Sequence, residues 1–365
     1  MMANKELIGG LAGHLTALGD FGEITEDELE PMRTTGLAHD HVRLNGHNLL
    51  ARVPKQSQMA LDAQTNLTYQ AACFARAAAS GHTPRLHAVL QPSADLPMGA
   101  LIVDEIDGTA LPLPGHIEAL AHALAALHTL PLPAEDGRPP LRNPLNALAD
   151  TFNEVMKQSA FIAAAGLAYG AEAQIREELV TAGTLLSRSD KPPVTLIAFD
   201  AHPGNFLLAA DGRAVLVDLE KARYGVPVFD LAHATLYTST TWDVATYAEL
   251  TADQVASFYA TWLATVPAAL AEAAIPWLLD LRRMMWLWSV TWCAKWRVRS
   301  QEAAIQGSRD SRSTEDWSVD LSDPALVAHV ADRVDHYLDP AIIERVRQDW
   351  RSDNALTGLL GHKSV

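Results

Sequence analysis

The sequence is poor in cysteine and in basic residues. It has two cysteines, Cys73 and Cys293, and 28 Lys and Arg against 44 Asp and Glu, which gives a formal net charge of −16 over 365 residues. Two distant cysteines cannot form a disulfide framework, so a reducing compartment is favoured. The acid excess leaves no broad basic face, which excludes an ordinary nucleic-acid-binding protein.

Long hydrophobic runs are also missing. The most apolar stretch, residues 277–298, is interrupted by charged residues such as Asp280 and Lys295, whereas a membrane-spanning helix needs about 18 or more apolar residues. The first residues lack the apolar segment of a secretory signal. We therefore expect a cytoplasmic protein that has no membrane partner.

Two familiar site motifs do not occur. The sequence has no GxxxxGK[ST] loop, which excludes a P-loop enzyme. None of its 14 histidines lies in an HExxH motif or a His/Cys ligand spacing, which argues against zinc. A metallohydrolase built from His202, Asp218, Asp230 and His233 would have no known spacing behind it.

The remaining composition is that of a globular protein. Hydrophobic residues make up 48% of the chain, which is enough for two domains or one large two-lobed domain. Most of the first hundred residues are typical of strands, and Asn45-Gly46 is a strong hairpin turn. We expect strands at 41–44, 49–53, 85–90 and 100–106 and a helix at 66–80 that ends at Gly81.

Helical patterns dominate from about Leu111 onward. They cover 116–130, 145–186 and most of the chain beyond Asp230, apart from a polar loop at 300–323, and short strands are expected at 194–198, 206–208 and 215–218. The order of these elements predicts an α+β fold with two lobes. These are a β-rich N-lobe at 1–103, a hinge at 104–107 and a mainly helical C-lobe at 108–365.

Polar residues with oxygen-bearing side chains gather in one strand–loop–strand–turn–strand unit, residues 196–232. Asp200, Asn205 and Asp218 stand at its strand ends and in its loop. Two of these side chains can converge on Mg²⁺, which takes few ligands from protein when phosphates and water supply the rest. The third can accept the proton of a hydroxyl nucleophile. This set of groups is sufficient for phosphoryl transfer.

The same unit resembles a known family. Asp200-x₄-Asn205 followed by Asp218, the intervening HPGN, the Asp-x-Glu at 218–220 and the Gly-x-Pro-x-x-Asp-Leu-Ala at 225–232 look like the aminoglycoside phosphotransferase and choline kinase-like branch of the protein-kinase-like superfamily. The resemblance extends more weakly from about Thr34 to Trp296. It implies a bilobal protein-kinase-like fold, ATP as co-substrate, Mg²⁺, and a hydroxyl on a small molecule as acceptor.

The resemblance also implies roles for single residues. Asp200 corresponds to the catalytic base, and Asn205 and Asp218 correspond to the magnesium ligands. Ala198 stands where the family usually has His, and Phe199 stands where Gly is common. Asp230 precedes an Ala- and Leu-rich segment, so it is interpreted first as a helix N-cap. In kinase-like folds an Asp at this position anchors the catalytic loop.

The N-lobe departs further from the family pattern. Arg52 stands where many kinases have the phosphate-binding Lys, and a guanidinium can bind phosphates bidentately. The position of its usual partner on the following helix, a Glu in the family, corresponds to Gln70 here, and we expect Arg52 and Gln70 to be hydrogen-bonded. Lys55 is a rival for the phosphate contact, and Asp104 at the hinge is a third expected nucleotide contact. The nucleotide-covering loop would be 34–40, which has one glycine.

Several residues have both a structural and a functional interpretation. Glu220 is either a group near the metal or a surface carboxylate, and His202 is more often structural than catalytic. Trp288, Trp292 and Trp296 recur at helical spacing, which is typical of core packing, although such a stripe can also form an aromatic wall for a cation. Trp242 and Asp243 lie in an exposed loop or reach the acceptor pocket.

The sequence therefore predicts a small-molecule phosphotransferase that uses ATP and Mg²⁺. The competing hypothesis is a catalytically inactive kinase-like protein that binds nucleotide or regulates a partner; Gln70, Ala198 and the glycine-poor loop support it. Most of the acid excess lies after residue 106, so we expect a cleft lined by carboxylates and an amine-bearing alcohol as acceptor. The oligomeric state stays open.

Overall fold

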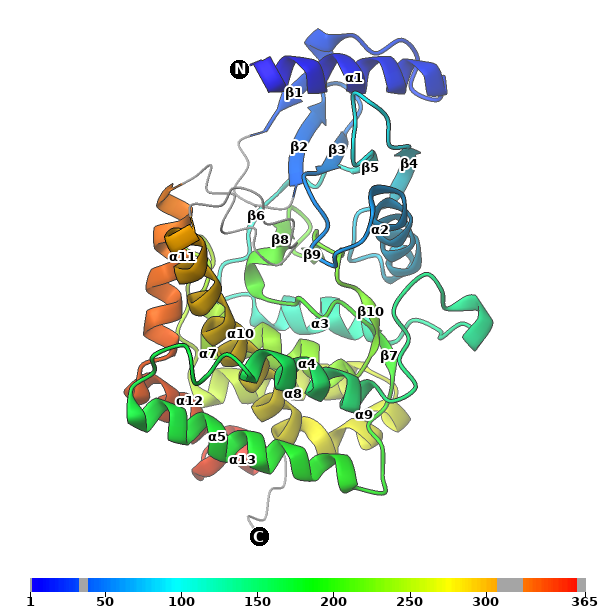
Figure 1. Ribbon diagram of the computed structural model, residues 1–365. Coiled ribbons are helices and arrows are strands. Elements are labelled where there is room, and N and C mark those ends of the chain that lie inside the picture. The colour runs from blue at the N-terminus through cyan, green and yellow to red at the C-terminus, as the bar shows by residue number, and fades with distance from the viewer. Residues whose placement is uncertain (1, 33–38, 307–323, 360–365) are drawn as a thin grey trace.

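The computed structural model describes residues 2–32, 39–306 and 324–359. It combines a β-sheet region near the N-terminus with a larger, mainly helical part, as Figure 1 shows. The predicted α+β class with a kinase-like, two-lobed arrangement is confirmed. No helix of the described ranges is long and apolar enough to cross a membrane.

The N-lobe is built on a five-stranded antiparallel sheet. The strand order is β1-β2-β3-β5-β4. The strands are β1 (Leu29–Pro31), β2 (His39–Leu44), β3 (Leu49–Pro54), β4 (Leu86–Leu90) and β5 (Ala100–Asp104). The turn after Leu44 uses Gly46 at φ 84°, a conformation that glycine adopts at little cost. The expected strands and the hairpin are therefore confirmed, with ends that differ by a few residues.

Two helices cover opposite faces of this sheet. Ile102 of β5 packs in one hydrophobic cluster with Leu11 and Leu15 of α1 (Met2–Leu18), whereas Leu101 belongs to the cluster that contains α2 (Ala63–Ala77). Successive strand residues point to opposite faces, so α1 and α2 lie on different sides. In Figure 1, α1 lies on the side away from the helical part. Helix α1 was not among the expected elements, and the expected helix 66–80 is α2 followed by a 3₁₀ turn.

The C-lobe consists of helices around two small sheets. The helices are α3 (Ile117–His128), α4 (Ala147–Ser159), α5 (Tyr169–Thr184), α6 (Pro227–Thr235), α7 (Tyr237–Thr240), α8 (Ala252–Thr265), α9 (Ala268–Ala274), α10 (Leu278–Gln306), α11 (Pro324–Tyr337), α12 (Pro340–Arg351) and α13 (Ala355–Leu359). A three-stranded sheet has the order β6-β8-β9, and β7 pairs with β10. These strands are β6 (Gly108–Ala110), β7 (Thr195–Ile197), β8 (Phe206–Ala209), β9 (Ala214–Leu216) and β10 (Arg223–Gly225).

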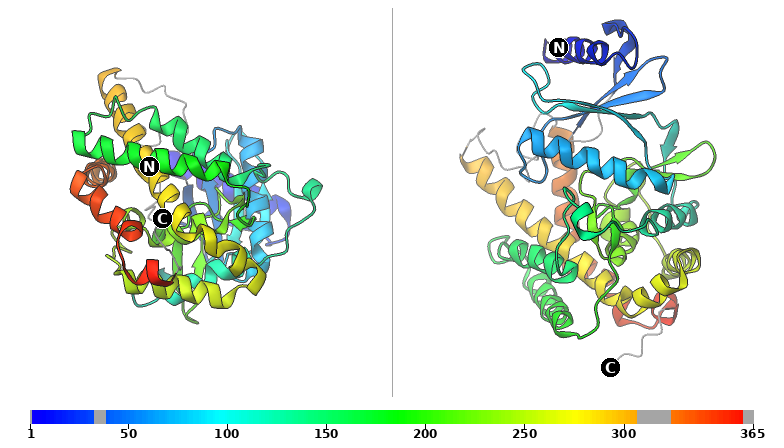
Figure 2. Two further views of the ribbon diagram at one scale, coloured as in Figure 1. Left: turned by 90° about the horizontal axis from the view of Figure 1, so that it is seen from below. Right: turned by 90° about the vertical axis from the view of Figure 1, so that its right-hand side faces the viewer.

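Helix α10 forms the central support of the C-lobe. It contacts α4, α5, α6 and α11 and crosses the lobe diagonally in the right-hand view of Figure 2. Trp286 of this helix is fully buried, so the apolar stretch identified in the sequence is core rather than membrane span. A polar loop was expected at 300–323, but residues 300–306 belong to α10, which continues to Gln306. Residues 307–323 lie outside the described ranges.

Candidate active site

One cavity of about 1,120 Å³ is lined by both the N-lobe sheet and the C-lobe. It holds four of the six site residues expected from the sequence, namely Arg52, Asp200, Asn205 and Asp218. Gln70 and Asp104 are not among the described residues that line it. The cavity is therefore the place where the predicted catalytic and metal-binding side chains meet.

The register of the β8–β9 hairpin brings Asn205 next to Asp218. Phe206 pairs with Leu216, and the Val217 N–H donates to the Asn205 carbonyl oxygen at 2.9 Å. Asp218 follows Val217 directly, so it lies beside Asn205 at this end of the hairpin. Two side chains that are 13 positions apart in the sequence thus face one space.

Asp230 anchors the loop that carries Asp200. Its carboxylate accepts hydrogen bonds from the backbone N–H groups of Ala198 (2.7 Å) and Phe199 (2.8 Å) and lies 3.0 Å from His128 Nε2. The side chain is completely buried inside α6. The interpretation of Asp230 as a helix N-cap is wrong, since Val226 holds that position. The loop-anchoring alternative describes the geometry.

Phe199 adopts a left-handed backbone conformation. Its φ is 63°, a region in which bulky residues are strained and glycine is not. The two bonds from Asp230 hold the backbone, and the ring packs 3.6 Å below the Arg223 guanidinium and edge-on to Trp288. The Phe199 side chain thus stabilises a turn whose backbone conformation glycine would adopt without strain.

Asp200 is held by a lysine from the neighbouring segment. Lys221 Nζ lies 2.7 Å from its Oδ2, and His233 Nδ1 lies 3.8 Å from its Oδ1. Burial alone would raise the pKa of Asp200, but Lys221, His202 and His233 together hold this pKa below its usual range. Burial lowers the pKa of His233 to about 4. Asp200 is therefore an ionised carboxylate that can accept a hydrogen bond.

Asn205 and Asp218 keep oxygen atoms available for a cation. The Asn205 amide nitrogen donates to the Asp200 carbonyl oxygen at 2.8 Å, which turns its Oδ1 the other way. Asp218 uses Oδ1 to accept from Arg52 (3.1 Å). Hard oxygen atoms of this kind suit Mg²⁺ when phosphates and water complete the shell. The donor set fits the expected metal.

Arg52 faces the cavity and Lys55 does not. Arg52 is 4% exposed and donates to the Val217 carbonyl oxygen at 2.8 Å as well as to Asp218. Lys55 forms an exposed ion pair with Asp40 at 3.1 Å. Burial would raise the pKa of Asp218, but Arg52 and then His39 keep it below the ordinary value.

The expected hydrogen bond between Arg52 and Gln70 is not formed. Gln70 Oε1 lies 3.1 Å from His39 Nε2, and its Nε2 donates to Glu220 Oε2 at 3.5 Å. The Arg52 guanidinium turns to Asp218 because a carboxylate neutralises it and an amide does not. Glu220 is buried. Its burial, as the main cause, and repulsion from Asp218, as the second, raise its pKa to about 8. Its interpretation as a surface carboxylate is wrong.

Asp104 lies at the end of β5 with its carboxylate already engaged. It accepts from Arg85 Nε at 3.0 Å, and His87 Nε2 lies 2.7 Å from its other oxygen. These contacts tie the end of β5 to β4, and a nucleotide contact by Asp104 stays a prediction. The expected nucleotide-covering loop 34–40 falls largely outside the described residues; His39 and Asp40 begin β2.

Aromatic side chains form one wall of the cavity. Trp288 and Trp292 of α10 line it together with Trp242, whose ring centroid lies 5.7 Å from that of Trp292. Trp296 is 8% exposed and belongs to the core, whereas Trp288 and Trp292 are partly buried against the same core and also line the cavity. Trp242 and Asp243 both reach the cavity. The ring of His202, which also lines the cavity, lies 6.0 Å from that of His233.

The expectation of a cleft lined by carboxylates is wrong. Among the described lining residues, seven are Lys or Arg and four are Asp or Glu. The basic ones are Arg52, Arg142, Lys157, Lys221, Arg223, Lys295 and Arg299, and the acidic ones are Glu154, Asp200, Asp218 and Asp243. The protein's acid excess therefore lies elsewhere.

Sequence reasoning missed Lys221 and Glu154. Lys221 comes three positions after Asp218, and its closeness to this predicted metal ligand in the chain was a signal that it could reach the same cavity. Glu154 lies on α4, far along the chain from the catalytic unit. It meets Arg223 at 3.0 Å and Arg142 at 2.5 Å. Local spacing holds no trace of such a contact.

The comparisons with known proteins identify the family and the fold. The family model described as "Phosphotransferase enzyme family" matches residues 39–272, which include every residue of the predicted site. Comparison of the sequence with curated proteins gave no match.

Solved structures with the same fold include several small-molecule kinases. A choline/ethanolamine kinase family protein from Mesorhizobium loti shares 17% identity at a TM-score of 0.53, over 90% of this chain and 99% of that one. Choline kinase from Cryptosporidium parvum Iowa II shares 13% identity at 0.56, over 98% and 100% of the chains. The GDP complex of aminoglycoside 2'-phosphotransferase-IIIa shares 15% at 0.56, over 90% and 97%. At these identities the likeness shows the fold.

Proposed function

The chain belongs to the phosphotransferase enzyme family, and we propose that it transfers the γ-phosphate of ATP to a hydroxyl group of a small molecule with the help of Mg²⁺. The observation that carries this proposal is the single cavity that contains Asp200, Asn205 and Asp218, with oxygen atoms of the last two available. We propose that this phosphoryl transfer takes place in the cytoplasm.

Arg52 and the two magnesium ligands form the nucleotide side of the cavity. Mg²⁺, when bound by Asn205 and Asp218, neutralises charge on the β- and γ-phosphates. The buried Arg52 guanidinium, already fixed by Val217 and Asp218, is pre-organised to contact phosphate oxygens. Residues 104–107 act as the hinge between an N-lobe at 1–103 and a C-lobe at 108–365, and Asp104 and Gln70 support the nucleotide pocket.

Asp200 orients the acceptor hydroxyl. Its low pKa makes it a weak base but a good hydrogen-bond acceptor, so it directs the hydroxyl oxygen toward the phosphorus and takes the proton late. Lys221, 2.7 Å from Asp200, supplies positive charge where the transferring phosphoryl group develops negative charge. Positioning and charge stabilisation are the main contributions to this type of reaction.

A catalytically inactive nucleotide-binding or regulatory protein is the second candidate. The observation that favours it is the pairing of Gln70 with His39 and Glu220, which leaves Arg52 without its usual helix partner. The Asp230 anchor weighs against it, because the catalytic loop is held without the histidine that Ala198 replaces.

The two candidates are separated by binding and turnover measured on the same protein. We expect ATP with Mg²⁺ to raise the melting temperature, and EDTA or Asp218→Ala to remove the Mg²⁺-dependent part of that shift. ADP release should then depend on an added alcohol. GTP is tested in parallel, and Asp211→Ala, an exposed turn residue, serves as the matched control.

If neither nucleotide binds at millimolar concentration, the proposed function is wrong. If nucleotide binds but no alcohol among amino alcohols, sugars and hydroxy acids stimulates ADP release, the inactive candidate is correct.

A further inference from the structure

The cavity is positively charged although the protein carries a net charge of −16. Seven Lys and Arg against four Asp and Glu line it among the described residues. Three of the four carboxylates already have cationic partners: Asp200 has Lys221, Asp218 has Arg52, and Glu154 has both Arg142 and Arg223. The pairing leaves little negative charge for a cationic acceptor.

Glu154 is the acidic residue beside the tryptophans with which the ammonium group of an amine acceptor could form an ion pair, if its carboxylate were unpaired. Its Oε1 lies 2.5 Å from Arg142 and 3.0 Å from Arg223, and its Oε2 accepts from the Trp288 indole N–H at 3.3 Å. A carboxylate held by two guanidinium groups is already neutralised. Asp243 is the remaining acid, and its Oδ1 accepts the Ala245 backbone N–H at 2.7 Å.

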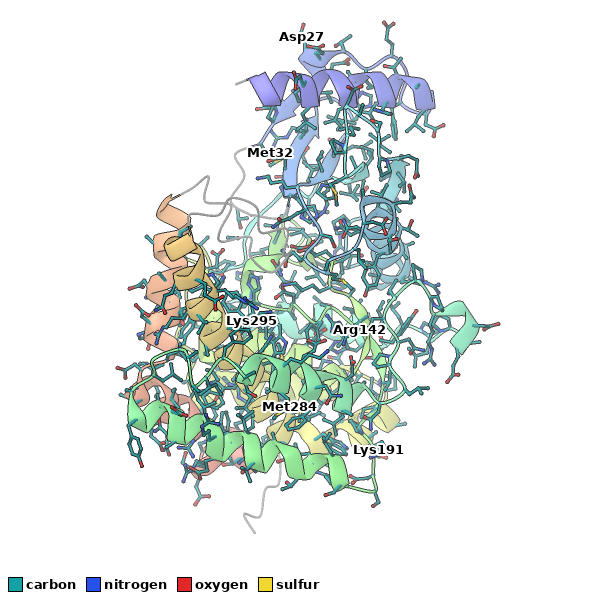
Figure 3. The ribbon with its side chains drawn as sticks, in the orientation of Figure 1. Asp27, Met32, Arg142, Lys191, Met284 and Lys295 are labelled. Carbon is teal, nitrogen blue, oxygen red and sulfur yellow. The ribbon has the colours of Figure 1, made fainter. Side chains whose placement is uncertain are left out.

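Cations line the cavity along the two helices α4 and α10. The residues of α10 that line it with Trp288 and Trp292 are spaced by three to four positions and end in Lys295 and Arg299, which is one helical face. Lys157 in the last turn of α4 lines the same cavity. Figure 3 labels Lys295 and Arg142 in the part of the C-lobe that faces the N-lobe sheet. We call Lys157, Lys295 and Arg299 the cationic rim.

Two buried hydroxyl groups also line the cavity. Thr238 and Ser239 are 5% and 2% exposed, and neither side-chain oxygen has a hydrogen-bond partner among the described residues. Buried polar groups normally have partners. Both are therefore available to a polar group of a ligand.

We propose, on the basis of the proposed function, that the acceptor is an alcohol that also carries an anionic group, a carboxylate or a phosphate, which the cationic rim binds. The lysine and arginine side chains supply charge-assisted hydrogen bonds to its oxygens, the tryptophans cover its apolar body, and Thr238 and Ser239 donate to its polar groups. The transferred phosphoryl group still goes to the hydroxyl beside Asp200.

The test compares alcohols that differ in one substituent. The probes are para-(hydroxymethyl)benzoate, para-(hydroxymethyl)phenyl phosphate, benzyl alcohol and para-(aminomethyl)benzyl alcohol. Binding to the full chain is measured by calorimetry with Mg²⁺ and ADP present, and kcat/KM is measured by ADP release with ATP. We expect at least one anionic probe to bind about tenfold more tightly than the neutral one, which is about 1.4 kcal/mol, and the amine to bind most weakly. The two anionic probes distinguish carboxylate from phosphate.

The rim itself is tested with Lys157→Ala combined with Lys295→Ala. The KM of the preferred anionic probe should rise about tenfold, whereas kcat and the KM of benzyl alcohol stay within twofold. Lys191→Ala, an exposed lysine outside the cavity, removes the same charge and should change nothing. If the double variant does not fold, Lys157→Gln at its exposed position provides the same comparison.

Equal or tighter binding of the amine, or no binding of any anionic probe at millimolar concentration, overturns the inference. This outcome is distinct from failure of the proposed function, which would appear as absent Mg²⁺–ATP binding whatever the acceptor.

Discussion

On the catalytic-loop side of the cavity, formed by Asp200, Asp218, Lys221 and Arg52, each charge meets an opposite charge within 3.1 Å. On the cationic rim, Lys157 and Arg299 are exposed. Arg299 forms an exposed ion pair with Glu302 on its own helix, and its guanidinium lies 5.0 Å from the centroid of the Phe161 ring. Paired, buried charges keep a fixed geometry at the reacting atoms. Exposed cations instead attract a ligand without a fixed geometry. The comparison indicates that chemistry resides on the first side and acceptor choice on the second.

The largest effect is expected from Asp200→Asn. An amide of the same shape cannot take the hydroxyl proton, so kcat should fall by about 10³-fold, while the Mg²⁺–ATP melting shift is retained. Single-turnover ADP formation measures it. Asp211→Asn, an exposed acid in the β8–β9 turn, is the control. A loss below tenfold would remove Asp200 from the chemistry and break the comparison.

Asp230→Ala should give the largest loss of stability. It leaves two backbone N–H groups and His128 without their buried acceptor, which costs about 3 kcal/mol. Urea unfolding of the ligand-free protein measures this change. The control is Asp253→Ala, an exposed acid in the first turn of α8, and a loss as small as that of the control would contradict the anchoring role.

Lys221→Met should shift the pH dependence of turnover. Burial raises the pKa of Asp200 and Lys221 is the leading group that lowers it, so removing the ammonium raises this pKa. The acid limb of kcat/KM, which lies at low pH in the wild type, should therefore move to higher pH. The readout is the pH–rate profile. An unmoved acid limb, as expected for Lys191→Met, would show that the pair is not electrostatically coupled to catalysis.

Arg299→Ala should have the smallest effect on stability. The Arg299–Glu302 ion pair is about half exposed on both sides, and such pairs contribute about 0.5 kcal/mol or less. Urea unfolding should therefore give the wild-type midpoint. A loss above about 2 kcal/mol would mean that the rim is a structural element, and the contrast between the two sides would disappear.

Several turns and one site motif were predictable from the sequence because their information is local. Asn45-Gly46, Gly81 and the Asp200-x₄-Asn205 spacing each depend on the conformational preferences of a few adjacent residues. Helix α1 was not predicted from the sequence because its amphipathic pattern is weak and the strands against which it packs lie further along the chain. Asp230 was misassigned for a similar reason: a residue before a helical pattern is usually a cap, and only the packed fold shows the loop it holds.

The sequence by itself determined most of the order of elements, the resemblance to the family, and the grouping of Arg52, Asp200, Asn205 and Asp218 in one site, because these depend on local pattern and spacing. Only the tertiary structure decided which charges meet. Arg52 forms its ion pair with Asp218 rather than a hydrogen bond with Gln70, and Glu154 is neutralised by Arg142 and Arg223. Charge pairing depends on distances between residues far apart in the chain, and net charge does not report it. A protein with a net charge of −16 can therefore enclose a cavity in which Lys and Arg outnumber Asp and Glu among the described lining residues.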